Sequence, residues 1–315
     1  MEKPEAILIA GPTASGKSAL AVELARRVGG VVVNADSMQV YEGLRILSAR
    51  PTPEEMGGVE HRLYGHVAPG EPYSAGAWLR EVEALLPELR ARGLVPVFCG
   101  GTGLYFRALT GGFDDLPEVP ALIRERWRAR MAEEGPAALH AVLSERDPEA
   151  AAKLRPSDPQ RILRALELFE TTGAPLSRLQ RGAGAGLVDG AAALKLVLAP
   201  DRALLRERIA RRFDAMLADG AEAEAAAFAA RPGAATGLAA SAIGVSELAR
   251  VRAGELTLAE ARDLSVTRTR QYAKRQETWF RNQFDASWLR FADPAEALAR
   301  LSRSAGKGAG EGETG

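Results

Sequence analysis

The stretch Gly11-Pro12-Thr13-Ala14-Ser15-Gly16-Lys17-Ser18 matches the pattern G-x-x-x-x-G-K-[ST] of a phosphate-binding loop, or P-loop. A short apolar run, Ile7–Ala10, precedes it, and an amphipathic segment, Ser18–Val28, follows it. We therefore predict a buried strand, the loop and a helix, which is the context that the motif requires. In a loop of this kind, backbone amides and the helix N-terminus bind phosphate oxygens. We expect Lys17 to contact the terminal phosphate and the Ser18 hydroxyl to be a ligand for Mg²⁺. The motif predicts a phosphorylated ligand but does not say whether it is a nucleotide.

The rest of the chain alternates strand and helix signals and then becomes helical. Further strands are predicted at Val31–Val33, Leu94–Phe98 and Leu194–Leu198, and helices at Arg80–Arg92 and after the N-cap residue Asp201. This alternation indicates an α/β fold with a parallel sheet covered on both faces. We predict a first part of the core at 1–116, a helical insertion at 117–185, a mostly helical return to the core at 186–303, and a disordered tail at 304–315.

Composition excludes several classes of protein. The 41 basic and 41 acidic residues balance, so any nucleic-acid contact must come from local patches. The single cysteine, Cys99, cannot form an internal disulfide, which is consistent with a reducing cytoplasm. No run approaches the roughly 18 apolar residues of a membrane span, and the three histidines lack the spacing of a zinc site. We expect a cytoplasmic protein without a membrane partner.

The segments that follow the second and third predicted strands carry the next candidate residues. The strand Leu94–Phe98 ends in Cys99-Gly100-Gly101-Thr102-Gly103, where nucleotide hydrolases have a magnesium-binding acid. Asp36 follows the second predicted strand, Val31–Val33. This position is at the carboxyl edge of the predicted sheet, where open α/β sheets bind their ligands. Asp36 is either a general base or metal ligand, or a turn residue bonded to its own backbone. Thr102 likewise either contacts a ligand or belongs to a packing turn, and Cys99 is interpreted as a core residue.

A basic and aromatic helix is predicted near the C-terminus. Arg268, Tyr272, Arg275 and Trp279 fall at i, i+4, i+7 and i+11 and share one face. Cations and aromatic rings on one face suit phosphate contacts and base stacking in RNA. The alternative is a solvated charged face with its aromatic rings turned to the core.

Five segments in order resemble the motifs of the bacterial tRNA dimethylallyltransferase family, also called tRNA isopentenyltransferases. They are GPTASGKS, NADSMQVY, CGGTGLYFRAL, DPQRILRALELFETTG and TRQYAKRQETWFRN, and they span residues 11 to 282. The resemblance implies a P-loop kinase-like core with an inserted helical domain that grips the anticodon arm of tRNA. It also implies transfer of a dimethylallyl group from dimethylallyl diphosphate to N6 of the adenosine 3′ of the anticodon, with Mg²⁺ as cofactor and diphosphate as product. The protein is expected to act as a monomer.

The resemblance also implies roles for individual residues. Gly11–Ser18 would hold the diphosphate and Mg²⁺, with Lys17 as a catalytic cation. Asp36 would be the general base on N6, Thr102 would touch the reaction centre, and Arg212 would stabilise the leaving diphosphate. The predicted tRNA contacts are Asp36, Ser37, Met38, Gln39, Thr102, Arg124, Gln160, Arg161, Ile162, Leu163 and Arg164, joined by Arg268 and Arg275 from the basic helix. The stretch Arg45–Pro51 and Val245 depart from the family pattern, which affects the expected packing near the substrate channel.

Three other functions fit parts of the sequence. The chain could be a small-molecule P-loop kinase with Asp36 as base, a prenyltransferase acting on free adenine nucleotides, or an RNA-binding protein with a regulatory nucleotide site. The helical insertion and the basic helix favour a macromolecular acceptor over the first two.

Overall fold

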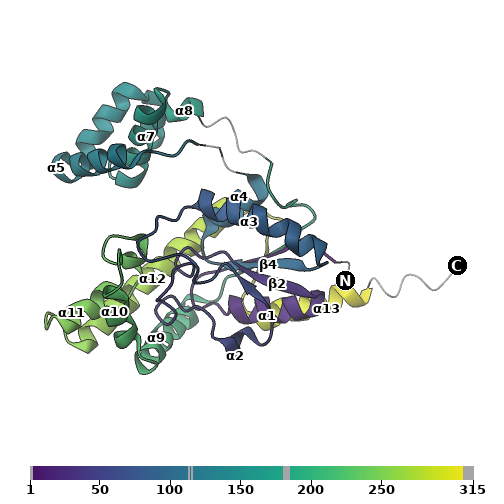
Figure 1. The fold of residues 1–315 in the computed structure, drawn as a ribbon. Coiled ribbons are helices and arrows are strands. Elements are labelled where there is room, and N and C mark those ends of the chain that lie inside the picture. The colour runs from purple at the N-terminus through teal and green to yellow at the C-terminus, as the bar shows by residue number, and fades with distance from the viewer. Residues whose placement is uncertain (1–2, 113, 115, 180–184, 308–315) are drawn as a thin grey trace. The chain divides into compact units, whose positions relative to one another are not determined.

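The computed structural model describes residues 3–307 except 113, 115 and 180–184 (Figure 1). The chain forms two compact units. Unit 1 contains the residues up to 110 and those from 187 onward, and unit 2 contains residues 111–186. Unit 2 covers the segment 117–185 that the sequence analysis assigned to a helical insertion.

Unit 1 is built on a parallel sheet in the order β3-β2-β4-β1-β5-β6. The strands are β1 (Ile7–Ala10), β2 (Gly30–Asn34), β3 (His61–Arg62), β4 (Val95–Gly100), β5 (Leu194–Leu198) and β6 (Leu289–Phe291). The register pairs Ala10 with Gly100 and Asn34 with Cys99. The carboxyl ends of β1, β2 and β4 therefore meet at one edge of the sheet.

The predicted α/β fold with a parallel sheet covered on both faces is confirmed. On one face, Leu8 and Phe98 pack against Trp78 of α3 (Ala75–Ala91), Phe106 of α4 (Gly103–Gly111) and Phe280 of α12 (Leu258–Gln283). The opposite face packs against α1 (Lys17–Val28) and α13 (Pro294–Lys307). Neighbouring residues of β1 alternate between these two cores, which explains why the whole strand is buried.

Further elements of unit 1 form a helical layer with a core of its own. They are α9 (Arg202–Ala218), α10 (Ala221–Ala229), the 3₁₀ helix η1 (Leu238–Ser241) and α11 (Val245–Arg252). The short helix α2 (Pro53–Met56) has no buried residue and does not take part in this core. Helices α9 to α12 bury apolar residues against the loop that carries Tyr41 and Leu44. Asp201 caps α9 as predicted, because its carboxylate accepts the N–H groups of Ala203 and Leu204.

The prediction that a disordered tail begins at residue 304 is wrong for its first four residues. Helix α13 continues to Lys307, so residues 304–307 are helical. Its earlier residues Ala297 and Leu301 are buried under the sheet, and the helix continues from this anchored part. The rest of the predicted tail, 308–315, lies outside the described residues.

Unit 2 is helical wherever the structure describes it. Its helices are α5 (Ala121–Arg146), α6 (Pro148–Lys153), α7 (Pro159–Thr172) and α8 (Leu176–Leu179). Gly135, with φ of 80°, and the following Pro136 kink α5. Trp127, Leu139, Leu143 and Ile162 are buried in a separate core. Across both units, no helix in the described parts of the chain is long and apolar enough to cross a membrane.

Candidate active site

The P-loop connects β1 to α1 in the predicted strand–loop–helix order. Ala14 and Gly16 adopt left-handed φ angles of 63° and 90°, so the loop turns sharply before the helix begins. The Ser15 N–H donates to the Pro12 carbonyl at 3.3 Å, and Lys17 Nζ lies 3.4 Å from the same oxygen. Burial lowers the pKa of Lys17. The loop thus holds a charged amine that a phosphate would stabilise.

Two groups from distant parts of the chain hold Thr13 of the P-loop. Arg212, on α9, donates a hydrogen bond to Thr13 Oγ1. On the other side, the Thr13 N–H donates to Gln276 Oε1 at 3.0 Å. Burial lowers the pKa of Arg212 to about 10, and the charge of Asp36 opposes this shift. Arg212 therefore stays protonated near neutral pH, beside the P-loop where the resemblance placed it.

Asp36 is held by a turn that begins at the end of β2. Its N–H donates to Asn34 Oδ1 at 2.9 Å, and its Oδ1 accepts the Met38 N–H at 3.0 Å. Asn34 is fully buried and donates to the Leu63 carbonyl at 3.0 Å, which fixes the turn to the sheet edge. The interpretation of Asp36 as a turn residue is confirmed, and its role as a general base or metal ligand stays a prediction. One carboxylate oxygen stabilises the turn, and the side chain also lines a cavity.

Thr102 contacts the Asp36 turn directly. Its hydroxyl accepts the Ser37 N–H at 2.9 Å and donates to Ser37 Oγ at 3.3 Å. The approach of these segments requires Gly100, because a Cβ there would collide with the carbonyl of Ala35. Neighbouring Cys99 is buried, and burial raises the pKa of its thiol to about 11, as expected of a core residue.

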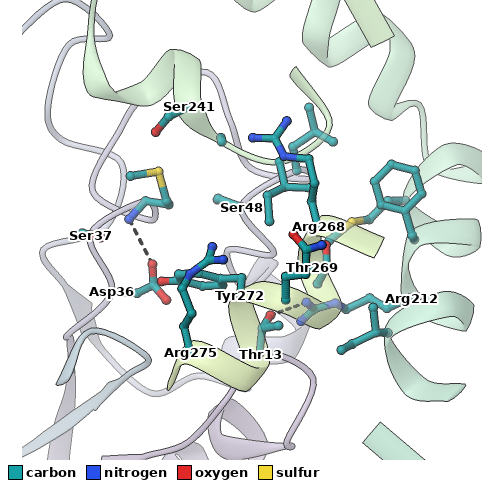
Figure 2. Close-up of a pocket in the computed structure, with 18 residues that line it drawn as sticks. Thr13, Asp36, Ser37, Ser48, Arg212, Ser241, Arg268, Thr269, Tyr272 and Arg275 are labelled. Carbon is teal, nitrogen blue, oxygen red and sulfur yellow. Dashed lines mark hydrogen bonds between the residues drawn. The ribbon is translucent and has the colours of Figure 1, made fainter. Parts of the chain in front are cut away.

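The P-loop residue Thr13, the Asp36 turn, α9 and α12 line one cavity of about 510 Å³ in unit 1 (Figure 2). Thr102 supports the Asp36 turn but is not among the lining residues. The polar lining of the cavity includes Thr13, Asp36, Ser37, Arg212, Arg268, Tyr272 and Arg275, and its apolar lining includes Met38, Leu47, Ile209, Phe213, Met216 and Ile243. In Figure 2, Arg212 reaches Thr13 on one side while Tyr272 and Arg275 lie beside Asp36. The cavity thus combines cations and a carboxylate with an apolar wall.

The predicted face of α12 contributes three of its four members to this cavity, namely Arg268, Tyr272 and Arg275. Trp279 instead packs against Gly103, where a Cβ would collide with the indole ring. The guanidinium of Arg275 lies 5.7 Å from the centre of the Tyr272 ring. The two side chains are thus in cation–π contact with each other in the lining of the cavity.

Arg268 differs from the prediction in one respect, because it also has a partner within the protein. It forms an ion pair with Glu247 of α11 and donates to Ser246 Oγ at 3.1 Å. Glu247 is buried, and its Oε2 also accepts the Gly244 N–H at 3.0 Å. The predicted contact of Arg268 with tRNA phosphate therefore competes with a structural ion pair.

In unit 2, the predicted tRNA contacts lie mostly on α7. Gln160 and Arg161 are exposed at its start, and Arg164 is half-buried. The prediction is wrong for the side chain of Ile162, which is fully buried in the core of unit 2, and Leu163 packs partly against the same core. On α5, Arg124 donates to the Val119 carbonyl at 3.0 Å. The amphipathic pattern of α7 turns Ile162 inward and leaves its polar neighbours outside.

Gln39 and the two departures from the family pattern are structural in this conformation. Gln39 Nε2 donates to the carbonyls of Ser48 and Ala49 at 3.0 and 2.9 Å. The backbone amides of residues 45, 46 and 47 all donate to the carboxylate of Glu224 at 2.8 Å. Val245 is buried in the same core as Leu47, which lines the cavity. The departures therefore lie beside the apolar wall of the cavity.

Asn34, Gln276 and Glu247 were not identified as site residues from the sequence. Asn34 and Gln276 lie inside motifs quoted above, but no local pattern specifies their partners. Together, the fold and the site define an α/β protein with a P-loop next to a carboxylate and several cations.

Comparison with known proteins specifies the family. Residues 39–283 match the family model "IPP transferase", and residues 4–66 match "Isopentenyl transferase". The chain is 56% identical over 290 residues to the tRNA dimethylallyltransferase of Rhizobium meliloti, covering 92% of this chain and 96% of the relative. It is 57% identical over 294 residues to that of Sinorhizobium medicae, covering 93% and 96%. The chain therefore belongs to the tRNA dimethylallyltransferase family.

Solved structures agree with this assignment. The tRNA isopentenylpyrophosphate transferase of Bacillus halodurans matches with a TM-score of 0.68 and 35% identity, covering 97% of each chain. A eukaryotic dimethylallyltransferase described as acting on tRNA matches with a TM-score of 0.78 and 27% identity, covering 96% of this chain and 77% of that one. The predicted P-loop kinase-like fold is confirmed.

The Arg268–Glu247 pair leads to a stability prediction. Replacing Arg268 with Met leaves the buried Glu247 carboxylate without its guanidinium, which should lower the free energy of unfolding by about 1–3 kcal/mol. Arg270→Met, at an exposed position of the same helix, should change it by less than about 0.5 kcal/mol. Urea denaturation measures both. Equal stability of the two variants would show that the ion pair contributes nothing.

Proposed function

We propose that the protein transfers a dimethylallyl group from dimethylallyl diphosphate to N6 of the adenosine 3′ of the anticodon in tRNA and releases diphosphate. The names of its relatives support this reaction. The observation that carries the proposal is the shared cavity, in which Thr13 of the P-loop, Arg212 and Asp36 face one space with an apolar wall. We propose that the protein acts as a monomer, since both donor and acceptor groups come from one chain.

The P-loop side of the cavity suits the donor. When the allylic carbon–oxygen bond breaks, negative charge develops on the leaving diphosphate. The loop amides, Lys17 and Arg212 stabilise this charge, and both cations are already placed before the ligand arrives. Ile209, Phe213 and Met216 lie on the apolar wall, where they keep water from the positively charged allylic carbon.

The Asp36 side of the cavity suits the acceptor. The exocyclic N6 of adenine is a weak nucleophile, so a base must remove its proton as the new carbon–nitrogen bond forms. The Met38 N–H holds Asp36 Oδ1, so the carboxylate is fixed and can accept the proton on its other oxygen. The adenine must leave its stack to reach the cavity, where Tyr272 and Arg275 offer a ring face and a cation. Thr102 fixes the turn beside the base.

The donor set around the P-loop fits Mg²⁺. Among the residues that the structure describes, no cluster of three His, Cys, Asp or Glu side chains could hold a metal by itself. Mg²⁺ commonly takes one or two protein ligands together with waters and substrate phosphates. The Ser18 hydroxyl at the start of α1 would supply a protein ligand, with Asp36 as a neighbouring carboxylate. The bound ion would add positive charge next to the leaving diphosphate.

We propose that unit 2 binds the anticodon arm of the tRNA. Gln160, Arg161 and Arg164 lie on the first two turns of α7, and Arg124 lies on the first turn of α5. Arg164 lies near the buried carboxylate of Glu167, whose charge opposes the lowering of the pKa of Arg164 by burial. Glu167 would thus orient Arg164, while the exposed Arg161 contacts phosphate.

The choice of donor tests this function against a P-loop kinase. We expect tRNA-dependent release of diphosphate from dimethylallyl diphosphate with Mg²⁺ and without ATP, and a prenylated adenosine in the digested tRNA by mass spectrometry. Lys17→Ala should abolish both, because the loop loses its point charge. A strict requirement for ATP, or product without tRNA, would contradict the proposal.

A second prediction concerns the base. Asp36→Asn keeps the shape of the side chain and an oxygen for the Met38 N–H, but it cannot take the proton from N6. Turnover should fall by about 10²–10⁴-fold, with binding of the prenyl diphosphate nearly unchanged. Single-turnover assays measure the first quantity and calorimetry the second, with the exposed Asp219→Asn as control. Turnover within about threefold of the unchanged protein would exclude Asp36 as the base.

A third prediction concerns α12. Arg275 is exposed and lines the cavity, so Arg275→Ala should weaken tRNA binding and reduce the slope of log affinity against log salt by about 1. Arg268→Ala should change the salt dependence of binding less, because the Arg268 guanidinium is already paired with Glu247. Binding titrations at several salt concentrations provide the slopes. An unchanged slope for Arg275→Ala would identify α12 as a structural face only.

A further inference from the structure

The Gln276 side chain bonds both the P-loop and the turn that contains Gly101. We infer that Gln276 is a positioning residue that holds the P-loop and the Gly101 turn at a fixed separation, so that the diphosphate and the Asp36 carboxylate face each other in one geometry. The inference rests on the proposed prenyl transfer, but the contacts that carry it do not depend on the identity of the acceptor.

Both ends of the Gln276 amide are bonded to backbone groups from distant parts of the chain. Its Oε1 accepts the Thr13 N–H at 3.0 Å, and its Nε2 donates to the Gly101 carbonyl at 2.9 Å. One partner is a donor and the other an acceptor, so the amide has one orientation that satisfies both. The side chain is 5% exposed, so water cannot replace either bond. A glutamine amide offers an N–H donor and a carbonyl acceptor at once without carrying a charge.

The two loops bonded by Gln276 are the P-loop, on the donor side of the proposed reaction, and the Gly101 turn, on the acceptor side. Thr13 is the P-loop residue whose hydroxyl also accepts from Arg212. Gly101 lies next to Asp36, since a Cβ built on Gly101 would lie 3.3 Å from Asp36 Oδ2 and would collide with Gln276 Nε2. A single side chain therefore links the Arg212–Thr13 contact on the donor side to the Asp36 carboxylate on the acceptor side.

The helix that carries Gln276 is firmly seated at this point. Trp279, three residues later, packs against Gly103 of the same turn, and Phe280 is buried under the sheet. Ala273, three residues earlier, is buried in the core that α12 shares with α9 to α11. Gln276 is therefore held from both sides along α12, and the separation that it sets between the loops has little freedom. Misplacement of reacting groups by about 1 Å can reduce a rate by about 10²-fold.

The test uses the whole protein with tRNA and dimethylallyl diphosphate. Gln276→Met removes both hydrogen bonds at similar side-chain volume. Gln276→Glu, assayed at a pH where its carboxylate is ionised, keeps an acceptor for the Thr13 N–H but loses the donor to Gly101. Gln283→Met, at the exposed end of the same helix, is the matched control. Three quantities are measured for each variant: kcat and KM for the prenyl diphosphate at saturating tRNA, the affinity and stoichiometry of inorganic pyrophosphate binding by calorimetry, and Tm.

We expect Gln276→Met to bind one pyrophosphate per chain with about 5- to 10-fold weaker affinity, because the loop is less preorganised. Its kcat should fall by about 10²-fold, more than KM changes. Gln276→Glu should lose kcat as well, and it serves as the test if the Met variant does not fold. The control should match the unchanged protein in all three quantities.

Two results would overturn the inference. One is a kcat within about threefold of the unchanged protein in the folded variants. The other is a loss of kcat that follows the fraction of chains able to bind pyrophosphate, which would indicate a role in folding alone. If the unchanged protein binds pyrophosphate but transfers no dimethylallyl group, the proposed function fails. The effect of Gln276→Met on pyrophosphate affinity then still decides the inference.

Discussion

The geometry of the site depends on how closely two backbone segments approach each other at the carboxyl edge of the sheet. Gly100 leaves no room for a Cβ against the Ala35 carbonyl. The ladder between β2 and β4 continues past the strands, with the Ala35 N–H donating to the Cys99 carbonyl at 2.9 Å and the Thr102 N–H to the Ala35 carbonyl at 3.2 Å. Asp36 and Thr102 follow directly from this ladder. Their positions are therefore as well defined as those of strand residues, although both stand in turns.

The charges of the site are arranged for a ligand with more negative charge than the protein supplies. Lys17 and Arg212 lie near the carboxylate of Asp36, and burial lowers the pKa of both cations. Such lowering means that the protein alone solvates these charges less well than water does. A diphosphate would offset that cost, so its binding should stabilise the folded state by linkage. The same excess of positive charge would stabilise the negative charge that develops on a departing diphosphate.

Most of the fold could be predicted from the sequence because its central strands are buried on both faces. Continuous apolar runs marked β1 and β5 at their observed bounds, and β2 and β4 within two residues of theirs. The two edge strands were not predicted. β3 has only two residues, His61 and Arg62, and two of the three residues of β6 are exposed. Such strands form because a neighbour offers free hydrogen-bonding groups, and the residues themselves carry no periodic signal.

The candidate site was predictable where its residues stand in recognisable motifs. Lys17 belongs to the P-loop motif, and Asp36 and Thr102 follow predicted strands, so the sequence placed all three at the edge of the sheet where the structure brings them. Arg268 was predicted from the pattern of its own helix, but its buried partner Glu247 belongs to α11.

Gln276 left no local signature, because it bonds backbone atoms of residues 263 and 175 positions away. Backbone partners can be supplied by any residue type, so the amino-acid pattern at those positions carries no record of the bond. Side chains that touch a ligand are constrained by the chemistry of that ligand, whereas side chains that position them are constrained only by tertiary geometry. Residues of the second kind therefore become visible only once the fold has brought the distant segments together.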